Sequence, residues 1–140
     1  FWLVLSNWVQ ISMSNLIDFV GRVLISVLFL LSAYNKILSI DGSMSWMEGF
    51  GISGLLLYPT IALEIILPIF IIIGYKAKIS AALLAIFCLA TAFIFHYDFN
   101  DQIETTAFLK NLGLAGGFLF ILVNGTKDWS IDRKKKYVRL

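Results

Sequence analysis

The sequence predicts an all-α protein: an integral membrane four-helix bundle. Of its 140 residues, 59% are hydrophobic and 14% are charged, whereas charged residues make up about 25% of an average soluble domain. The mean hydropathy is +0.87. Four long apolar runs are each close to the roughly 20 residues that a helix needs to cross a bilayer. These runs predict one membrane domain over residues 15–126.

Residues 1–14 precede the first apolar run as an N-terminal extension. The first methionine of the chain is Met13, and Trp2 and Trp8 precede it. One interpretation is that translation starts at Met13 and that the preceding residues are an addition. The other is an interfacial helix anchored by Trp2 and Trp8, because indole rings favour the membrane surface. Both interpretations remain open at this stage.

The four spans are expected at residues 16–38, 58–75, 79–97 and 107–124. Pro59 favours a start of the second span near Tyr58, because proline is well tolerated in the first turn of a helix. With that start, Glu64 lies about 9 Å below the membrane boundary, since an α-helix rises about 1.5 Å per residue. A start at Ser53 would move the Glu64 carboxylate about 7 Å deeper, away from the end of the first span.

Basic residues gather on one side of the predicted membrane. Nine of the eleven Lys and Arg residues lie near the start of the first span, between the second and third spans, or in the tail of residues 127–140. The other two connections carry acidic residues. Because Lys and Arg accumulate on the cytoplasmic side, both termini are expected to be cytoplasmic. The tail is interpreted first as a solvated topology signal and second as a surface for anionic lipid or a partner.

One polar side chain from each span is expected near the outer end of the bundle: Lys36, Glu64, His96 and Asn111. Ionisable groups inside a membrane are costly and normally face protein or a water-filled cavity. One hypothesis is a site in which Glu64, His96 and Lys36 exchange protons and balance charge. The alternative, given equal weight, is a closed network that locks the register of the helices.

Other polar and aromatic residues near this end are expected to contact a bound molecule: Asn111, Tyr34, Trp46 and Tyr97. The chain has one histidine, His96, and one cysteine, Cys88, which are too few for a bis-histidine haem, a thiolate metal site or a CxxC pair. No metal, intrinsic cofactor or nucleic-acid partner is expected. A redox ligand would therefore be a quinone or would belong to another subunit.

Two further motifs are expected to have structural roles. Gly113 and Gly117 form a GxxxG pattern that allows close helix packing, within the chain or between copies in a homo-oligomer. Asp18 and Arg22, four residues apart on one helix, are interpreted as a solvated or interfacial ion pair.

Segments spread along the chain resemble DoxX-type small membrane proteins. They are GRVLISVLFLLSAYNKIL, GFGISG, ALEIILPIFIIIGYKAK, AFIFHYDF and KNLGLAGGFLFILVNGTKDWSID. The positions that match the polar pattern of the family are Gly21-Arg22, Lys36, Glu64, His96, Asn111-Leu112 and Ser130 to Asp132. The resemblance extends over residues 15–132.

The resemblance implies a multi-pass protein of the bacterial inner membrane that is associated with redox systems. Its relatives include subunits of quinol-oxidising and thiosulfate-to-quinone complexes, so a quinone ligand and other membrane subunits as partners are implied. The alternative is an accessory subunit without chemistry of its own, which binds a larger membrane complex. The third hypothesis, a small transporter, is weaker because one four-helix unit shows no inverted repeats.

Overall fold

The structure, a computed structural model, describes residues 1–138, with the side chain of residue 137 left out. Within this range the chain is helical and has no strand. The elements are α1 (Trp2–Leu38), α2 (Ile40–Gly49), η1 (Gly54–Leu56), α3 (Leu57–Ile73), α4 (Ala77–Phe95), α5 (Gln102–Asn124) and α6 (Ile131–Val138). Four helical segments are long and apolar enough to cross a membrane: residues 2–38, 54–73, 77–95 and 102–124. The predicted all-α, four-span fold class is confirmed.

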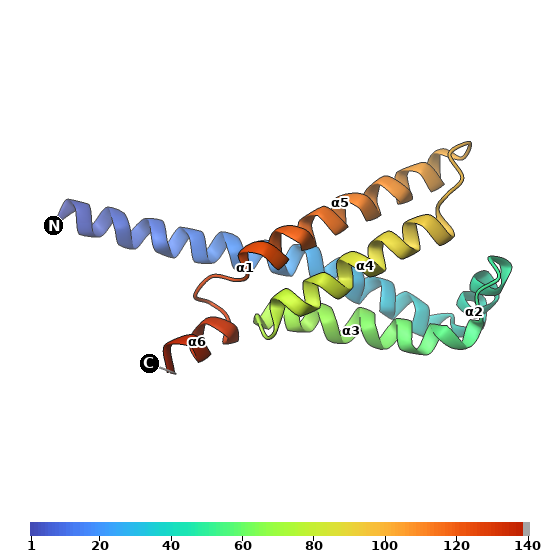
Figure 1. Ribbon diagram of the computed structural model, residues 1–140, viewed down its shortest axis with the longest axis horizontal. Helices are drawn as coiled ribbons and strands as arrows, with labels where there is room; N and C mark the ends of the chain where they lie inside the picture. Colours follow the sequence, from blue (N-terminus) through green and yellow to red (C-terminus); the bar gives the residue numbers. More distant parts are fainter. Residues whose placement is uncertain (139–140) are drawn as a thin grey trace.

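The first helix is longer than a membrane span requires. α1 has 37 residues, and its N-terminal part extends alone beyond the other helices (Figure 1). Residues 1–14 therefore continue the first span without a break and do not form a separate helix. Trp2 and Trp8 are 82% and 68% exposed on this part, whereas the buried positions of α1 begin at Asn15. Interfacial placement of residues 1–14 stays a prediction.

The four long helices form two pairs, in which α1 packs against α3 and α4 packs against α5. α4 contributes small side chains to the apolar core between the pairs, among them Ala77, Ala81 and Cys88. Small side chains allow neighbouring helices to approach closely. Phe29 of α1 meets Phe118 of α5 across this core, with ring centroids 5.5 Å apart. The core fills the half of the bundle in which α3 ends and α4 begins.

The start of α3 sets the depth of its single carboxylate. α3 begins at Leu57, directly after the short helix η1, so Pro59 occupies its first turn, where no amide donor is lost from the helix. Glu64 then lies about two turns into α3 and is 3% exposed. Pro68, one turn further, cannot donate a hydrogen bond to the Glu64 carbonyl.

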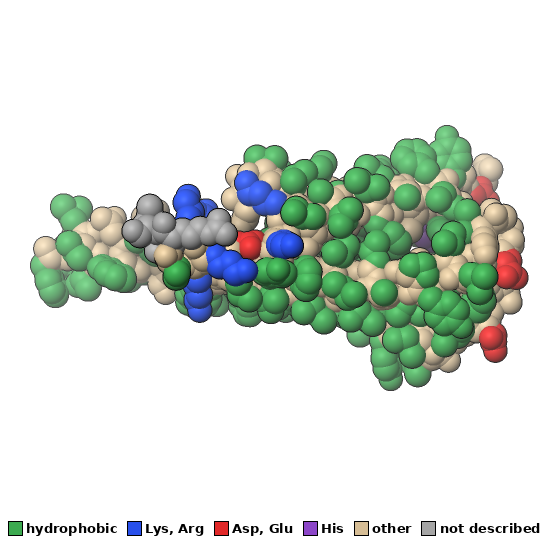
Figure 2. Space-filling model, turned by 60° about the horizontal axis from the view of Figure 1, so that its bottom comes forward, with side chains coloured by type: hydrophobic (Ala, Val, Ile, Leu, Met, Phe, Trp, Pro, Cys, Tyr) green, Lys and Arg blue, Asp and Glu red, His purple; other side chains and the backbone are tan. Residues whose placement is uncertain are grey.

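Charge separates along the length of the bundle. We call one end the basic end, defined by Lys76, Lys78, Lys127, Arg133, Lys134, Lys135 and Lys136. We call the other the acidic end, defined by Asp41, Glu48, Asp98, Asp101 and Glu104. Figure 2 shows Lys and Arg gathered towards one end, with one acidic group among them, and other acidic groups at the far end. Apolar side chains cover the surface between the two ends, as expected for a bilayer-spanning protein.

Arg22 is buried at the basic end and connects three segments. Its Nη1 donates to the carbonyl oxygens of Ile71 and Ile72 at the end of α3. Its Nη2 donates to the Trp129 carbonyl oxygen, 2.7 Å away, before α6. The Asp18 carboxylate accepts from its Nε at 3.0 Å. The expected Asp18–Arg22 ion pair is present. Of the two settings expected for it, solvated or interfacial, the solvated one is wrong, because Arg22 is 2% exposed. Its guanidinium binds carbonyl groups at the C-terminal end of α3, where helix carbonyls lack part of their usual donors.

The end of the chain folds back on the turn between α3 and α4. The Asp132 amide donates to the Gly74 carbonyl oxygen at 2.9 Å, and its carboxylate accepts from the amides of Lys76 and Ala77 at 2.8 and 2.9 Å. Gly74 has a φ of 68°, and a Cβ added there would lie 2.2 Å from the Ser130 Cβ. Residues 127–138 thus include a docked helix, α6, not only a free basic tail.

The GxxxG pattern is used unequally. A Cβ added at Gly117 would lie 2.9 Å from the Ile25 Cδ1 of α1, whereas a Cβ added at Gly113 would meet nothing within 4 Å. Gly117 therefore provides close packing inside the chain. A role of Gly113 in contacts between copies stays a prediction.

Candidate functional site

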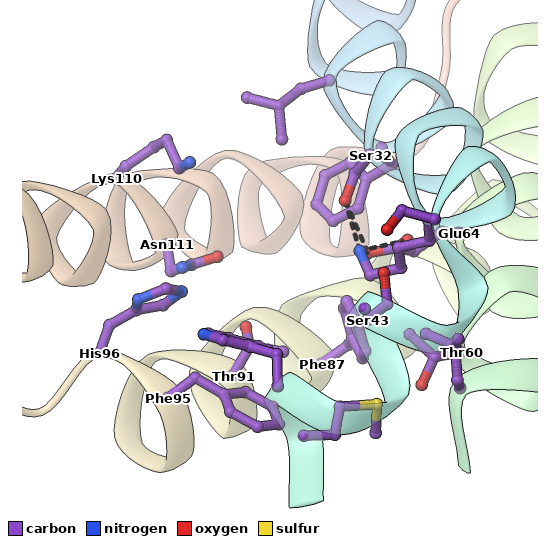
Figure 3. A pocket seen from close by; sticks show the side chains of 18 residues that line it. Ser32, Ser43, Thr60, Glu64, Phe87, Thr91, Phe95, His96, Lys110 and Asn111 are labelled. Carbon is purple, nitrogen blue, oxygen red and sulfur yellow. Dashed lines mark hydrogen bonds and ion pairs between the residues drawn. The ribbon is translucent and has the colours of Figure 1, made fainter. Parts of the chain in front are cut away.

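A pocket of about 540 Å³ lies in the half of the bundle next to the acidic end, which we call the acidic half. It is bordered by the α1–α3 pair, the α4–α5 pair and α2 (Figure 3). Small-molecule sites in proteins commonly have volumes of about 300–1,000 Å³. Phe29 forms part of both the lining and the apolar core, so the core closes the pocket towards the basic end. The apolar core thus lies in one half of the bundle and this pocket in the other.

One side of the pocket carries a partly buried ion pair between α1 and α3. The Lys36 Nζ lies 3.0 and 2.9 Å from the two carboxylate oxygens of Glu64. Ser32, one turn before Lys36, accepts from the Lys36 Nζ at 2.6 Å and donates to the Glu64 carboxylate at 3.2 Å. Because Glu64 is buried in a span, this pairing offsets part of the cost of removing its charge from water. The predicted contact between Lys36 and Glu64 is present.

The opposite side carries His96, which pairs with a residue that the sequence did not single out. The His96 Nδ1 lies 2.6 Å from the Glu104 carboxylate in the first turn of α5. Figure 3 shows His96, Lys110 and Asn111 on one side of the pocket and Ser32 and Glu64 on the other. His96 and Glu64 thus belong to separate pairs. Within the described residues, the His96 Nε2 makes no hydrogen bond, so this nitrogen is available to a ligand.

Trp46 of α2 gives the pocket a flat aromatic wall. Its ring is stacked on that of Phe95, with centroids 4.7 Å apart and planes inclined by 28°. The His96 ring lies next to it, at 6.2 Å between centroids. α2 lies directly after α1 and places Trp46 in the lining of the pocket. A planar ligand could stack on this wall while it contacts the polar groups.

Two neighbouring residues of α5 add polar groups to the lining. Asn111 donates from its Nδ2 to the Ala107 carbonyl of its own helix at 3.0 Å, so it does not join the Lys36–Glu64 pair. Lys110 also lines the pocket and has no acidic partner among the described side chains. The predicted four-residue network is therefore replaced by two separate ion pairs, with Asn111 and Lys110 beside them.

The structure brings five of the seven predicted site residues to this pocket: Lys36, Trp46, Glu64, His96 and Asn111. Tyr34 and Tyr97 do not line it. Tyr34 follows the buried Ala33 on α1 and points outward, with 57% of its surface exposed. Tyr97 is 62% exposed and packs against Phe93, Phe99 and Phe108 on the outside of the α4–α5 pair.

Among the polar residues of the site that were not assigned to it from the sequence are Ser32, Glu104 and Lys110. Ser32 lies four residues before Lys36, which places it on the same face of the helix. Glu104 follows Asp101, whose carboxylate accepts from the Ile103 and Glu104 amides and so begins α5 at Gln102. The four-residue spacing from Lys36 could have indicated Ser32 as a site residue. The partner of His96 could not be found in this way, because it depends on where α5 starts.

The site combines an imidazole, a buried carboxylate and two ammonium groups around a partly apolar pocket. Such an arrangement can bind a polar headgroup or a ring with oxygen substituents, and the imidazole can exchange a proton with it. Among the described residues, no group of three His, Cys, Asp or Glu side chains is close enough to hold a metal ion.

The fold and the pocket define a class: small, multi-pass membrane proteins with a polar site between the helices. The family model described as DoxX matches residues 17–97. The chain is similar to two inner membrane proteins of Escherichia coli K12. It is 36% identical to YqjF over 114 residues, or 81% of this chain and 88% of YqjF. It is 26% identical to YphA over 122 residues, or 82% of this chain and 87% of YphA.

The chain belongs to the DoxX family, and it is a multi-pass protein of the bacterial inner membrane. No solved structure gives a significant match. The family match ends at Tyr97, so it includes Lys36, Glu64 and His96 but not Glu104, Lys110 or Asn111 on α5.

Proposed function

We propose that this protein is a membrane subunit of a quinone-linked redox complex and that it binds the quinone in the acidic-half pocket. The observation that carries the proposal is a pocket of about 540 Å³ with an aromatic wall and with ionisable side chains on opposite sides. A quinone ring is flat and accepts hydrogen bonds at two oxygens, one on each side of the ring. The Trp46–Phe95 wall suits the ring, and the donors on the two sides suit the oxygens.

In this proposal the two ion pairs have different tasks. His96 presents its Nε2 to one oxygen of the ligand and exchanges a proton with it. Glu104, bonded to the Nδ1 of the same ring, stabilises the charged imidazolium. On the other side, the Lys36 ammonium faces the second oxygen and Glu64 balances its charge. A bound quinone would supply the electron chemistry, and the electrons would come from a partner subunit.

The experiment is a titration of the purified protein in mild detergent with decylubiquinone, a short-chain quinone, followed by quenching of tryptophan fluorescence. Glu64→Gln and His96→Ala are expected to weaken binding about tenfold or more, because each removes one ionisable group from the pocket. Asp41→Asn is the matched control, since Asp41 lies at the same end but does not line the pocket. Equal affinities in all four proteins would contradict the proposal.

A second function is favoured by one observation. Lys36 already binds both Glu64 oxygens and Ser32, and His96 already binds Glu104. Closed pairs of this kind fit an accessory subunit whose polar groups hold the helices in register. Purification of the native complex in mild detergent distinguishes the two functions. A protein side chain from a stoichiometric partner inside the pocket supports the accessory role, and a bound small molecule supports the quinone site.

We also propose that both termini face the cytoplasm. The support is the gathering of Lys and Arg at the basic end, which contains α6 and the turn before α4, because such residues are retained on the cytoplasmic side. The acidic-half pocket would then lie towards the periplasm.

A further inference from the structure

A second pocket, of about 600 Å³, lies at the basic end where the start of α4, the end of α5 and α6 meet. Its lining includes four cationic side chains: Lys76, Lys78, Arg133 and Lys136. Asp132 is the one acidic side chain among the described residues of the lining, and both of its carboxylate oxygens already accept backbone amides at the start of α4. The pocket therefore has a surplus of positive charge.

The α6 segment and its Arg133 side chain are held in place by contacts with other segments. The Asp132 amide is bonded to the α3–α4 turn at Gly74, and the Arg22 guanidinium is bonded to the Trp129 carbonyl just before α6. The Arg133 Nε donates to the Thr126 carbonyl oxygen at 2.7 Å. This bond fixes the guanidinium while its two terminal nitrogens make no hydrogen bond among the described residues. The pocket is built by the fold and is not a chance gathering of tail lysines.

The pocket lies where the membrane-spanning helices end. α4 begins at Ala77 and α5 ends at Asn124, so the cations are placed at the level of lipid headgroups. Ile79, two residues inside α4, is part of the same lining and is 61% exposed. Directly below the charged groups the surface is therefore apolar and faces lipid. A ligand with a negative headgroup and an acyl chain could contact both the charged groups and the apolar surface beside them. A water-soluble anion would contact only the charged groups.

We propose that this pocket is a binding site for one anionic phospholipid, whose phosphate lies between Lys76, Arg133 and Lys136 and whose acyl chain runs past Ile79. Basic pockets at this level of membrane proteins commonly hold acidic lipid headgroups. Arginine bonded through one nitrogen can still bind phosphate oxygens through the other two. The site lies at the opposite end of the bundle from the proposed quinone pocket and does not depend on it.

The experiment measures lipid binding to the purified full chain by native mass spectrometry, with dioleoyl-phosphatidylglycerol titrated into mixed micelles. The pocket variant is Lys76→Gln with Lys136→Gln. The control variant is Lys127→Gln with Lys134→Gln, which removes the same charge from the basic end but outside the pocket. Each lysine next to the bound headgroup is expected to contribute about fivefold to the affinity, so we expect about 25-fold weaker binding for the pocket variant.

Saturable binding of one phosphatidylglycerol is expected for the wild-type protein, with dioleoyl-phosphatidylcholine bound at least tenfold more weakly. The control variant should stay within about threefold of wild type, because a general loss of charge has only a diffuse effect. Lys76→Arg with Lys136→Arg should restore binding, which excludes misfolding as the cause. Equal losses in the pocket and control variants would overturn the proposal. Displacement of the lipid by millimolar inorganic phosphate would overturn it as well, since it would show a site for the free anion.

Discussion

The two halves of this membrane domain use buried charge in opposite ways. In the half next to the basic end (the basic half), Arg22 donates hydrogen bonds to the backbone carbonyls of Ile71, Ile72 and Trp129 and to the Asp18 carboxylate. An apolar core adjoins it. In the acidic half, two ion pairs face each other across a pocket. Arg22 therefore stabilises the fold by connecting backbone segments, whereas the charged groups that line the pocket can also contact a ligand.

The largest effect is expected at Arg22. Replacing Arg22 with Ala removes the guanidinium from the Asp18 carboxylate and from three carbonyl groups, and the loss of one partner from a buried charged pair costs about 3–5 kcal/mol. The free energy of unfolding, measured by SDS titration of the protein purified in mild detergent, should fall by that amount. Arg22→Lys keeps the charge but not the planar fork, so it should recover only part of the loss. If the Arg22→Ala protein were as stable as wild type, buried charge in the basic half would not stabilise the fold, and the contrast between the two halves would be refuted.

A second, smaller effect is expected at Gly74. Alanine there must adopt a left-handed backbone with a φ of 68°, and its Cβ would overlap with Ser130. The two costs together should destabilise the protein by about 3 kcal/mol in the same unfolding assay. Gly113→Ala is the matched control, because a Cβ at Gly113 meets nothing within 4 Å.

For Gly113→Ala the free energy of unfolding should rise by about 0.5–1 kcal/mol, since alanine is the better helix former. A change of oligomeric state in this variant, measured by light scattering, would show that Gly113 contacts a second copy. If Gly74→Ala and Gly113→Ala had equal stability, the close docking of α6 on the α3–α4 turn would be refuted.

The smallest effects separate the two ion pairs of the acidic half. Double-mutant cycles with Lys36→Met and Glu64→Gln, and with His96→Ala and Glu104→Gln, measure the coupling energy of each pair. The partly buried Lys36–Glu64 pair should give about 1–2 kcal/mol, and the more exposed His96–Glu104 pair about 0.5 kcal/mol. A larger coupling for His96–Glu104 would mean that this pair is also a structural clamp, and it would favour the accessory function over a ligand site.

Much of the architecture follows from local features of the sequence. Apolar runs of bilayer length predict the spans, and Pro59 predicts where α3 starts. Lys36 lies near the end of one span and Glu64 near the start of the next, so their depths match and their contact could be expected. Asn111 and His96 were placed at the correct end for the same reason. These predictions need only the rise of a helix and the length of a span.

Other features of the site could not be predicted in this way. The partner of His96 depends on where α5 begins, and Asp101 decides this by capping the helix at Gln102. Whether Tyr34 faces the pocket or the lipid depends on the rotation of α1 against α3, which packing sets. The i, i+4 spacing of Asp18 and Arg22 is the same in a solvated pair and in a buried clamp. Only the carbonyls of α3, brought near from about 50 residues away, distinguish the two.

The sequence by itself determined that this chain crosses the membrane with four helices and carries ionisable groups near one end. The reason is thermodynamic. Each apolar helix is stable in lipid by itself, and each polar group in a span needs a hydrogen-bond or ion-pair partner. The tertiary structure decided which partner each of these polar groups has. Contacts between helices depend on their rotation and separation, and these are set by small residues such as Gly117 and by the docking of α6. The positions of the apolar core and of the pocket in the acidic half result from those contacts.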